Sequence, residues 1–145
     1  MTPLATTASD SEMSSSLEDY LETIYLLALR QDTVGISQVA AARGVTIPTA
    51  RAAVQRLKQD GCIRQERYGK IILTEEGRER AASVYRTHST LYRFLHGVLG
   101  VPAETADNDA CKLEHGLSET TLGRLMEFLD ARSAPAADEA SRRAR

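Results

Sequence analysis

Apolar side chains recur at three- and four-residue intervals through most of the chain, which is the spacing of one face of an α-helix. The first such stretch predicts a helix over residues 16–30, with Ser16 available as its N-cap. A shorter helix is expected over residues 37–43, because Gly44 follows it in a position that suits a helix C-cap. Thr46 can cap a third helix that begins directly afterwards.

A strand-like pattern replaces this helical spacing in one place, over residues 62–74. That stretch predicts a short β-hairpin with its turn at residues 68–70. Helical spacing then resumes over residues 75–99, again over residues 103–116, and a last time from Ser118, a possible N-cap, to about residue 131. The expected order is therefore three helices, a hairpin and three further helices.

This order of elements predicts a mainly α-helical protein with two domains. A helix, a short turn, a second helix and a hairpin form a winged helix-turn-helix with a small β-hairpin wing, expected over residues 16–76. An all-helical domain is expected over residues 77–132. Residues 1–15 and 133–145 are rich in small residues and lack apolar periodicity, so a disordered leader and a disordered tail are expected there.

The composition is that of an ordinary globular protein, with 145 residues of which 42% are hydrophobic and 26% are charged. No apolar run reaches the ~18 residues of a membrane helix, and the start of the chain lacks a signal-peptide core. Two cysteines, Cys62 and Cys111, are too few for a secreted disulfide scaffold. A reducing cytoplasm is therefore the expected location.

The formal net charge of -2 hides an uneven distribution. Residues 36–74 have a balance of +5, whereas residues 17–35 have a balance of -3 and residues 101–130 a balance of -5. A basic middle thus lies between two acidic flanks. Local charge rather than the total decides which partners bind, so the net charge does not exclude nucleic acid. Chance clustering on solvated faces is the alternative interpretation.

The basic segment coincides with the predicted helix-turn-helix, which indicates a DNA-binding surface. In this motif the N-terminal end of the second helix enters the major groove. Thr49 can hydrogen-bond a base edge, Pro48 can contact a thymine methyl group, and Arg51 can pair with guanine or phosphate. A winged helix that binds only protein is the alternative. Gln38 and Arg43 are also placed to contact the DNA backbone. The residues expected to bind DNA are Ser37, Thr46, Pro48, Thr49, Arg51, Arg67, Tyr68 and Lys70.

A second group of side chains has the composition of a metal site. Two carboxylates stand three residues apart on the first helix, and a cysteine, a glutamate and a histidine stand at positions i, i+3 and i+4 of a later one. Such a mixed set suits a five- or six-coordinate Fe(II) or Mn(II) ion better than a tetrahedral structural zinc. His96 and Cys62 fit no cluster and are expected to be structural. The candidate ligands are Asp19, Glu22, His88, Cys111, Glu114 and His115.

Three stretches also resemble a known family. They are Leu17–Tyr25 (LEDYLETIY), Val84–Leu95 (VYRTHSTLYRFL) and Asn108–Glu119 (NDACKLEHGLSE). They are similar to the diphtheria toxin repressor and manganese transport regulator (DtxR/MntR) family, which are bacterial metal-activated transcriptional repressors. The similarity covers about residues 16–131. It implies that the six candidate ligands hold a metal ion.

The ligand pattern combines the two branches of that family. Asp19 and Glu22 resemble the manganese-sensing branch, whereas Cys111 resembles the iron-sensing branch. The iron branch has a second, ancillary site with acidic and imidazole groups where this chain has Tyr92 and Asp107, which puts that site in question. Only a short tail follows the last predicted helix, where longer members carry an SH3-like domain, so the short two-domain form is expected.

Dimerisation is expected because a helix-turn-helix usually reads two half-sites by symmetry. The C-terminal helices also carry more apolar side chains, Leu99 and Leu113 among them, than a small lone bundle hides. The alternative is that these side chains form only an intramolecular core. The helical domain is thus expected to serve both metal binding and dimerisation.

These features predict a metal-dependent transcriptional repressor, not an enzyme, which binds double-stranded operator DNA as a homodimer and controls metal-homeostasis genes. The thiolate favours Fe(II), with Mn(II) as the alternative, and Co(II), Ni(II) or Zn(II) are expected to bind in vitro. Neither a membrane nor a small organic substrate is expected as a partner. Two other functions stay open, a metal-independent winged-helix regulator and a small metal-dependent hydrolase.

Overall fold

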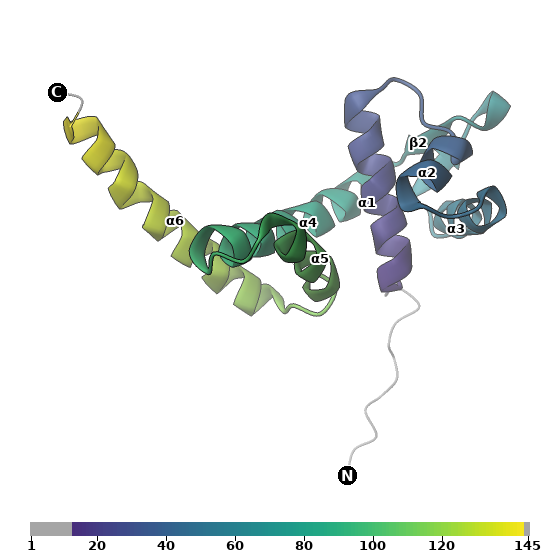
Figure 1. Ribbon diagram of the computed structural model, residues 1–145. Helices are drawn as coiled ribbons and strands as arrows, with labels where there is room; N and C mark the ends of the chain where they lie inside the picture. Colours follow the sequence, from purple (N-terminus) through teal and green to yellow (C-terminus); the bar gives the residue numbers. More distant parts are fainter. Residues whose placement is uncertain (1–12, 144–145) are drawn as a thin grey trace, which may run out of the picture. The chain divides into compact units, whose positions relative to one another are not determined.

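The structure, a computed structural model, describes residues 13–143, without the side chains of Tyr68 and of residues 134–143. Most of the leader predicted over residues 1–15 therefore lies outside the described residues. The chain divides into two compact units, with the boundary between Ser83 and Val84. Figure 1 shows the mainly helical architecture that the sequence predicts. Within the described residues, no helix combines the length and the apolar character needed to cross a membrane.

The N-terminal unit has the predicted order of three helices and a hairpin. Its elements are α1 (Ser15–Arg30), α2 (Ile36–Arg43), α3 (Ile47–Gln59), β1 (Ile63–Gln65) and β2 (Ile71–Leu73). The N-cap of α1 is Ser14 rather than Ser16, and its hydroxyl accepts a hydrogen bond from the backbone N–H of Leu17. Three successive serines offer the same capping group, so the sequence pattern alone does not choose between them.

The core of this unit is formed by the apolar faces of the three helices. Leu21 and Ile24 of α1 pack in one buried cluster with Val39 of α2 and with Val54 and Leu57 of α3. Each of these side chains is almost completely excluded from solvent. Full burial of one such side chain is worth about 1.5–3 kcal/mol, so this cluster fixes α3 against the other two helices.

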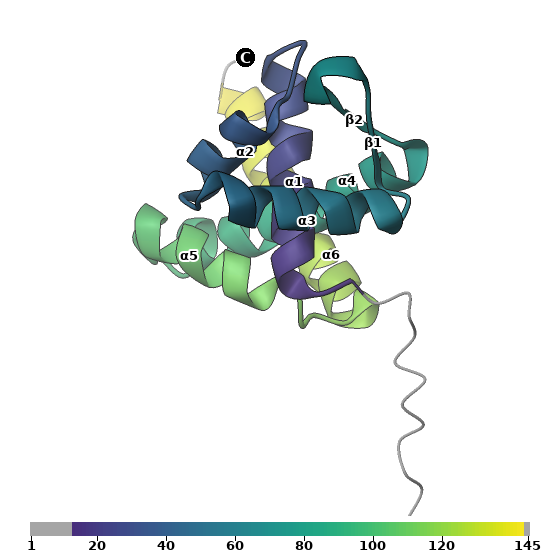
Figure 2. The same ribbon diagram turned by 90° about the vertical axis from the view of Figure 1, so that its right-hand side faces the viewer.

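The hairpin is short and antiparallel, with Ile63 opposite Leu73 at its base (Figure 2). A 3₁₀ turn over Arg67–Gly69 joins the strands. The segment between α1 and α2 joins the hairpin at one point, where the N–H of Ile71 donates to the carbonyl oxygen of Val34 over 2.9 Å. Val34 therefore ties strand β2 of the wing, at the end next to the turn, to the segment that leads into α2.

The long helix α4 (Glu75–Tyr92) begins in contact with Cys62, the residue directly before β1. Gly77 lies so close to the backbone of Cys62 that a Cβ atom at this position would lie 1.9 Å from the Cys62 carbonyl oxygen. Only glycine allows this approach. The helix continues across the boundary of the two units and carries His88 in the second of them.

The C-terminal unit contains the end of α4, a π-helical segment η2 (Arg93–Val98), α5 (Ala103–Leu113) and α6 (Glu119–Arg143). The predicted helix over residues 75–99 is therefore helical to Val98, but its last part is π-helical rather than α-helical. The N–H of Leu99 donates to the carbonyl oxygen of Phe94, five residues earlier, which is the wider spacing of a π-helix.

Two other boundaries differ from the sequence prediction. The helix predicted over residues 103–116 ends at Leu113, where Glu114 is the C-cap and the N–H of Gly116 closes a turn onto the Leu113 carbonyl. The backbone is helical as far as Arg143, so the tail predicted over residues 133–145 is wrong over most of its length. Alanine and arginine, which are the commonest residues of this stretch, have high helix propensity and outweigh the lack of an apolar face.

Candidate metal centre and DNA-binding surface

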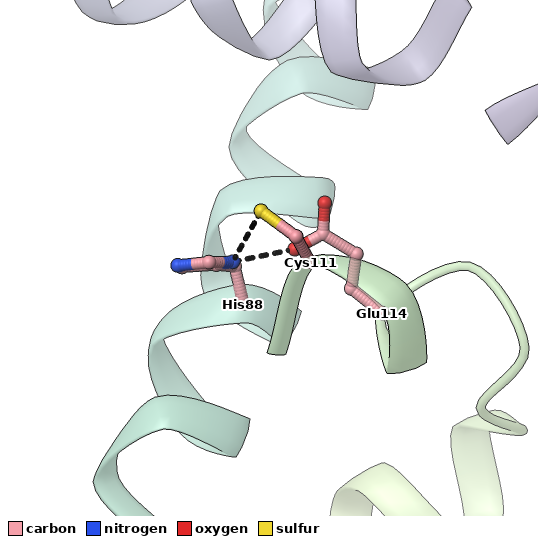
Figure 3. A group of neighbouring side chains, drawn as sticks. All are labelled: His88, Cys111 and Glu114. Carbon is pink, nitrogen blue, oxygen red and sulfur yellow. Dashed lines mark hydrogen bonds and ion pairs between the residues drawn. The ribbon is translucent and has the colours of Figure 1, made fainter. Parts of the chain in front are cut away.

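The C-terminal unit brings three candidate ligands together. Nδ1 of His88 lies 2.7 Å from Oε2 of Glu114 and 3.7 Å from Sγ of Cys111. One ligand atom from each of these residues lies within 4.8 Å of the other two. Figure 3 shows the imidazole of α4 facing the thiol and the carboxylate of the helix opposite. The sequence predicted these three residues as candidate ligands, and the structure shows that their side chains lie close together.

Helix geometry explains why these side chains meet. Cys111 and Glu114 stand three residues apart, and therefore on one face of α5 and its C-cap. On the same helix, Ala106 and Ala110 are completely buried. Their small side chains allow a close approach of the α5 backbone to its neighbours, which brings the thiol and the carboxylate within reach of His88.

His115 lies beside this cluster through Glu114. Nε2 of His115 is 3.3 Å from Oε1 of Glu114, whose other oxygen contacts His88. The side chain of Glu114 is 0% exposed, whereas those of the two histidines are 13% and 12% exposed. A carboxylate in such a dry position requires partners that carry or share positive charge. Both of its oxygens are directed at imidazole groups.

The chemistry of this donor set fits a divalent transition-metal ion. Imidazole nitrogen, thiolate sulfur and carboxylate oxygen are the three protein ligand types that such ions take, and here they converge at partly buried positions. Cys111 is half-buried, whereas Cys62 is completely buried in the core of the N-terminal unit. Burial raises the pKa of the Cys62 thiol, which keeps it protonated and unsuited to metal binding.

Asp19 and Glu22 belong to α1 in the N-terminal unit. They stand three residues apart on that helix, as the sequence predicts, and both are partly buried. An oxygen of Asp19 lies 3.8 Å from a guanidinium nitrogen of Arg43, at the end of α2. The guanidinium also lies over the ring of Tyr20, 5.3 Å from its centroid. Asp19 is thus in electrostatic contact with the helix-turn-helix.

The turn between α2 and α3 has the form that the sequence predicts. Gly44 adopts the left-handed conformation, with φ of 67°, and ends α2. Thr46 is the N-cap of α3, and its hydroxyl oxygen accepts from the N–H of Thr49. Pro48 and Arg51 are exposed in the first turns of α3. The N-terminal end of α3 therefore presents its predicted DNA contacts to solvent.

The predicted DNA contacts outside α3 lie at the start of α2 and in the wing. Ser37 is exposed at the start of α2, and Arg67 is exposed at the wing tip with Lys70 half-buried beside it. The side chain of Tyr68 lies outside the described residues. Gln38, by contrast, has a structural role: its side-chain oxygen accepts from the N–H of Gly35 and caps α2.

The structure also shows a candidate DNA contact that the sequence reading passed over. Ile47 is the first residue of α3, and 46% of its surface is exposed. A large apolar side chain at the tip of a recognition helix is placed to meet thymine methyl groups. Its position directly after the N-cap could have identified Ile47 from the sequence. The contact with a thymine methyl group was assigned from the sequence to Pro48, one residue later.

The remaining histidine, His96, is structural as predicted. Its Nδ1 donates to the carbonyl oxygen of Val101 over 2.8 Å, and its ring stacks on that of Tyr92. Asp107 contacts His88 through a carboxylate oxygen 2.8 Å from Nε2. Tyr92 and Asp107, which stand where the iron branch has ancillary ligands, thus both have partners within the protein.

The sequence matches two halves of one family. Residues 12–71 match the domain described as iron dependent repressor, N-terminal DNA binding domain, and residues 74–138 match the iron dependent repressor, metal binding and dimerisation domain. The chain belongs to the iron-dependent repressor family. The resemblance inferred from the three sequence stretches is thereby confirmed, and the family consists of transcriptional repressors rather than enzymes.

Individual members of the iron-dependent repressor family are similar over most of this chain. An HTH-type transcriptional regulator of Methanocaldococcus jannaschii is 38% identical over 120 residues, which are 81% of this chain and 95% of that protein. The iron-dependent repressor IdeR of Mycobacterium tuberculosis is 34% identical over 83% of this chain and 52% of its own length. The chain thus spans about half the length of IdeR.

The fold is shared with solved structures of the family. The manganese regulator SloR superimposes with a TM-score of 0.73 at 30% identity, over 81% of this chain and 55% of that one. The fold predicted from the sequence, an N-terminal winged helix-turn-helix followed by a helical domain, is confirmed.

Proposed function

We propose that this protein is a metal-activated transcriptional repressor that binds double-stranded operator DNA as a homodimer when loaded with Fe(II) or Mn(II), and so controls metal-homeostasis genes. One observation carries the proposal. An imidazole, a thiol and a buried carboxylate converge in a chain whose other unit is a winged helix-turn-helix. The names of IdeR and SloR, an iron-dependent repressor and a manganese regulator, support it.

The metal ligands proposed in the C-terminal unit are His88, Cys111, Glu114 and His115. A divalent ion supplies positive charge among these donors when it is bound. Glu114 is the central residue of the set, because its two oxygens are directed at the two imidazoles. Its burial removes competing water from the carboxylate, which strengthens electrostatic contacts there.

Asp19 and Glu22 are the proposed ligands from α1. Their spacing on one helix face and the family resemblance support this assignment. A ligand set drawn from both units makes binding depend on conformation, because the donors act together only when all of them converge. Binding then shifts the population towards conformations that bring them together, which is how DNA affinity would respond to metal.

The DNA-binding surface is proposed to comprise the N-terminal end of α3 and the wing tip. The exposed residues Thr46, Pro48, Thr49 and Arg51 would contact bases and phosphates in the major groove. Ser37 would contact the DNA backbone, and Arg67, Tyr68 and Lys70 would reach phosphates or the minor groove. The balance of +5 over residues 36–74 supports this assignment, because phosphate contacts supply most non-specific affinity.

Fe(II) is the proposed physiological ion, with Mn(II) as the alternative. The thiolate of Cys111 is the ligand that favours the softer ion, and Mn(II) is the weakest binder in the usual order of divalent affinities. Co(II), Ni(II) and Zn(II) are expected to bind in vitro for the same reason.

The homodimer is proposed to form through the C-terminal unit. The matching domain is described as a dimerisation domain. Within the described residues, Leu99 and Leu113 are 58% and 48% exposed in this unit, as expected for apolar side chains that a second copy covers. Neither a membrane nor a small organic substrate is part of the proposal.

The test is a DNA-binding titration under anaerobic conditions, with a DNA fragment selected from a random pool by the Mn(II)-loaded protein. Fe(II), Mn(II) and Zn(II) are each added to the metal-free protein. We expect the unaltered protein to bind DNA only with metal. Glu22→Ala and Glu114→Ala should lose this metal-activated binding, and the exposed control Glu119→Ala should keep it. Equal binding in the presence of a chelator would instead support a metal-independent regulator.

A further inference from the structure

The imidazole of His88 is held from both sides. Its Nδ1 faces Glu114 and Cys111, at 2.7 Å from Oε2 and 3.7 Å from Sγ. Its Nε2 lies 2.8 Å from Oδ1 of Asp107. In Figure 3 one ring nitrogen is joined to the thiol and the carboxylate, and the other points away from them. The two nitrogens therefore meet chemically different surroundings.

The sequence of α5 produces this arrangement. Asp107 stands four residues before Cys111 and seven before Glu114, so the three side chains form one row along the helix. The row runs from an exposed carboxylate to a buried one, since the side chain of Asp107 is 61% exposed and that of Glu114 is 0% exposed. His88 lies against the whole row. The thiol and the buried carboxylate take one nitrogen, and the exposed carboxylate takes the other.

A histidine that binds a metal through one nitrogen usually donates its other N–H to a carboxylate or carbonyl group. This hydrogen bond fixes the tautomer and the orientation of the ring, and raises the basicity of the binding nitrogen. We propose that Asp107 is a positioning residue for His88, whose carboxylate accepts the Nε2–H and thereby presents Nδ1 to the metal. This inference rests on the proposed function.

The competing role for Asp107 is that of a direct ligand to a second ion. The geometry favours positioning, because its Oδ1 is already at hydrogen-bond distance from Nε2 of His88. Within the described residues, the clusters with metal-ligand spacing include His88, Cys111 and Glu114 but not Asp107. Tyr92, the other residue at a position of an ancillary ligand in the iron branch, has a phenol ring that stacks on His96, with 5.4 Å between the centroids.

The first measurement is metal affinity. The full-length protein and its variants are titrated with Mn(II) and Co(II) against a chelating dye. Loss of the hydrogen bond in Asp107→Ala is expected to weaken binding by about 10- to 100-fold. Asp107→Asn keeps an oxygen that can accept from Nε2–H and should recover most of the affinity. Asp109→Ala removes the same charge from another face of α5 and should bind as the unaltered protein does.

The second measurement identifies the ligating nitrogen. Long-range ¹H–¹⁵N spectra of the Zn(II)-loaded protein should show His88 bound through Nδ1 and protonated at Nε2. Asp107→Ala should broaden or change this pattern, and Asp107→Asn should restore it.

Three results would overturn the inference. They are unchanged affinity in Asp107→Ala, zinc bound through Nε2 of His88, and equal losses in Asp107→Ala and Asp107→Asn together with one fewer ion bound per subunit. The last result would make Asp107 a ligand. If the unaltered protein binds no metal, the proposed function itself fails, which is a separate outcome.

Discussion

Arg43 and Asp19 form an ion pair that joins the end of α2 to α1, with 3.8 Å between a guanidinium nitrogen and a carboxylate oxygen. Both side chains are partly exposed, and the guanidinium also lies over the ring of Tyr20. The pair connects a proposed metal ligand with the first helix of the helix-turn-helix. Metal binding to Asp19, as proposed, would therefore compete with a contact inside the DNA-binding unit.

Removal of this competitor should strengthen metal binding. We expect Arg43→Ala to raise the affinity for Mn(II) by about two- to fivefold, in keeping with the modest energy of a partly exposed ion pair. Competition with a chelating dye measures the change. Arg30→Ala, which removes a cation from the end of the same helix α1 as Asp19, is the control and should leave the affinity unchanged. Weaker binding in Arg43→Ala would mean that the ion pair orients Asp19 for the metal.

The cations of α3 and the wing should contribute to DNA affinity through phosphate. Arg51→Ala and Arg67→Ala are each expected to weaken binding most at low salt, and to reduce the slope of log affinity against log salt by about 0.9 for each lost phosphate contact. Fluorescence anisotropy over a salt series measures this slope. The control is Arg78→Ala, an exposed cation of α4 outside the proposed surface. An unchanged slope in both variants would remove these residues from the interface.

Ile47 should read thymine through its methyl group. Ile47→Ala removes apolar contact and is expected to weaken operator binding by about three- to tenfold, which corresponds to one or two of the removed carbons being buried against DNA at ~0.8 kcal/mol each. Replacing single thymines by uracil in the selected DNA locates the partner base. At that base the uracil substitution should weaken the unaltered protein but not the variant. If the losses from Ile47→Ala and from the uracil substitution were additive at every thymine, the Ile47 side chain would not contact a thymine methyl group.

The two cysteines should differ sharply in reactivity. Burial raises the pKa of the Cys62 thiol, helped by Glu76 and Asp60 and opposed by Arg80, so little reactive thiolate forms at neutral pH. Cys111 is half-buried and should react with iodoacetamide, more slowly when Mn(II) or Zn(II) is present. Mass spectrometry of the alkylated protein locates each modification. Rapid alkylation of Cys62, or no protection of Cys111 by any metal, would contradict this expectation.

The raised pKa of Cys62 also has a consequence for stability. The unfolded chain loses this proton at a lower pH than the folded protein does. The contribution of the protonated thiol to folding is therefore complete below the ordinary thiol pKa and declines as the pH rises above it.

Gly77 should be intolerant of any side chain. Alanine normally stabilises a helix by up to ~1 kcal/mol relative to glycine. At position 77 its Cβ would lie 1.9 Å from the Cys62 carbonyl oxygen, so Gly77→Ala is expected to lower the free energy of unfolding by about 1–3 kcal/mol. Gly123→Ala in α6 meets no atom within 4 Å and is the matched control, with unchanged or higher stability. Urea denaturation of both variants decides the question.

The sequence predicted those features that depend on local pattern. Apolar spacing located the three N-terminal helices to within a residue or two, and Gly44 and Thr46 marked the turn because their capping roles are local. The residue types of the candidate metal cluster were also visible, since Cys111 and Glu114 share a helix face by spacing alone. For these features the periodicity of one helix carries the information.

Features that depend on neighbouring elements were not predictable in this way. The hydrogen bond of Asp107 to His88 joins residues 19 positions apart on two helices, and no local pattern reveals it. The hydrogen bond that the side chain of Gln38 accepts from the N–H of Gly35 was likewise not predicted. The π-helical segment also escaped prediction, because the apolar spacing of residues 93–98 is compatible with an ordinary helix.

The bridge between Val34 and Ile71 helps to fix the distance between the wing and α3, which a bound DNA duplex has to match. Because Ile71, beside the turn of the wing, is hydrogen-bonded to the segment that leads into α2, and α2 packs on α3, the wing and α3 are held together in one packed unit. A duplex bound by both would adapt its groove width to this arrangement. Operator sequences that deform easily would then be preferred at base pairs that no side chain touches.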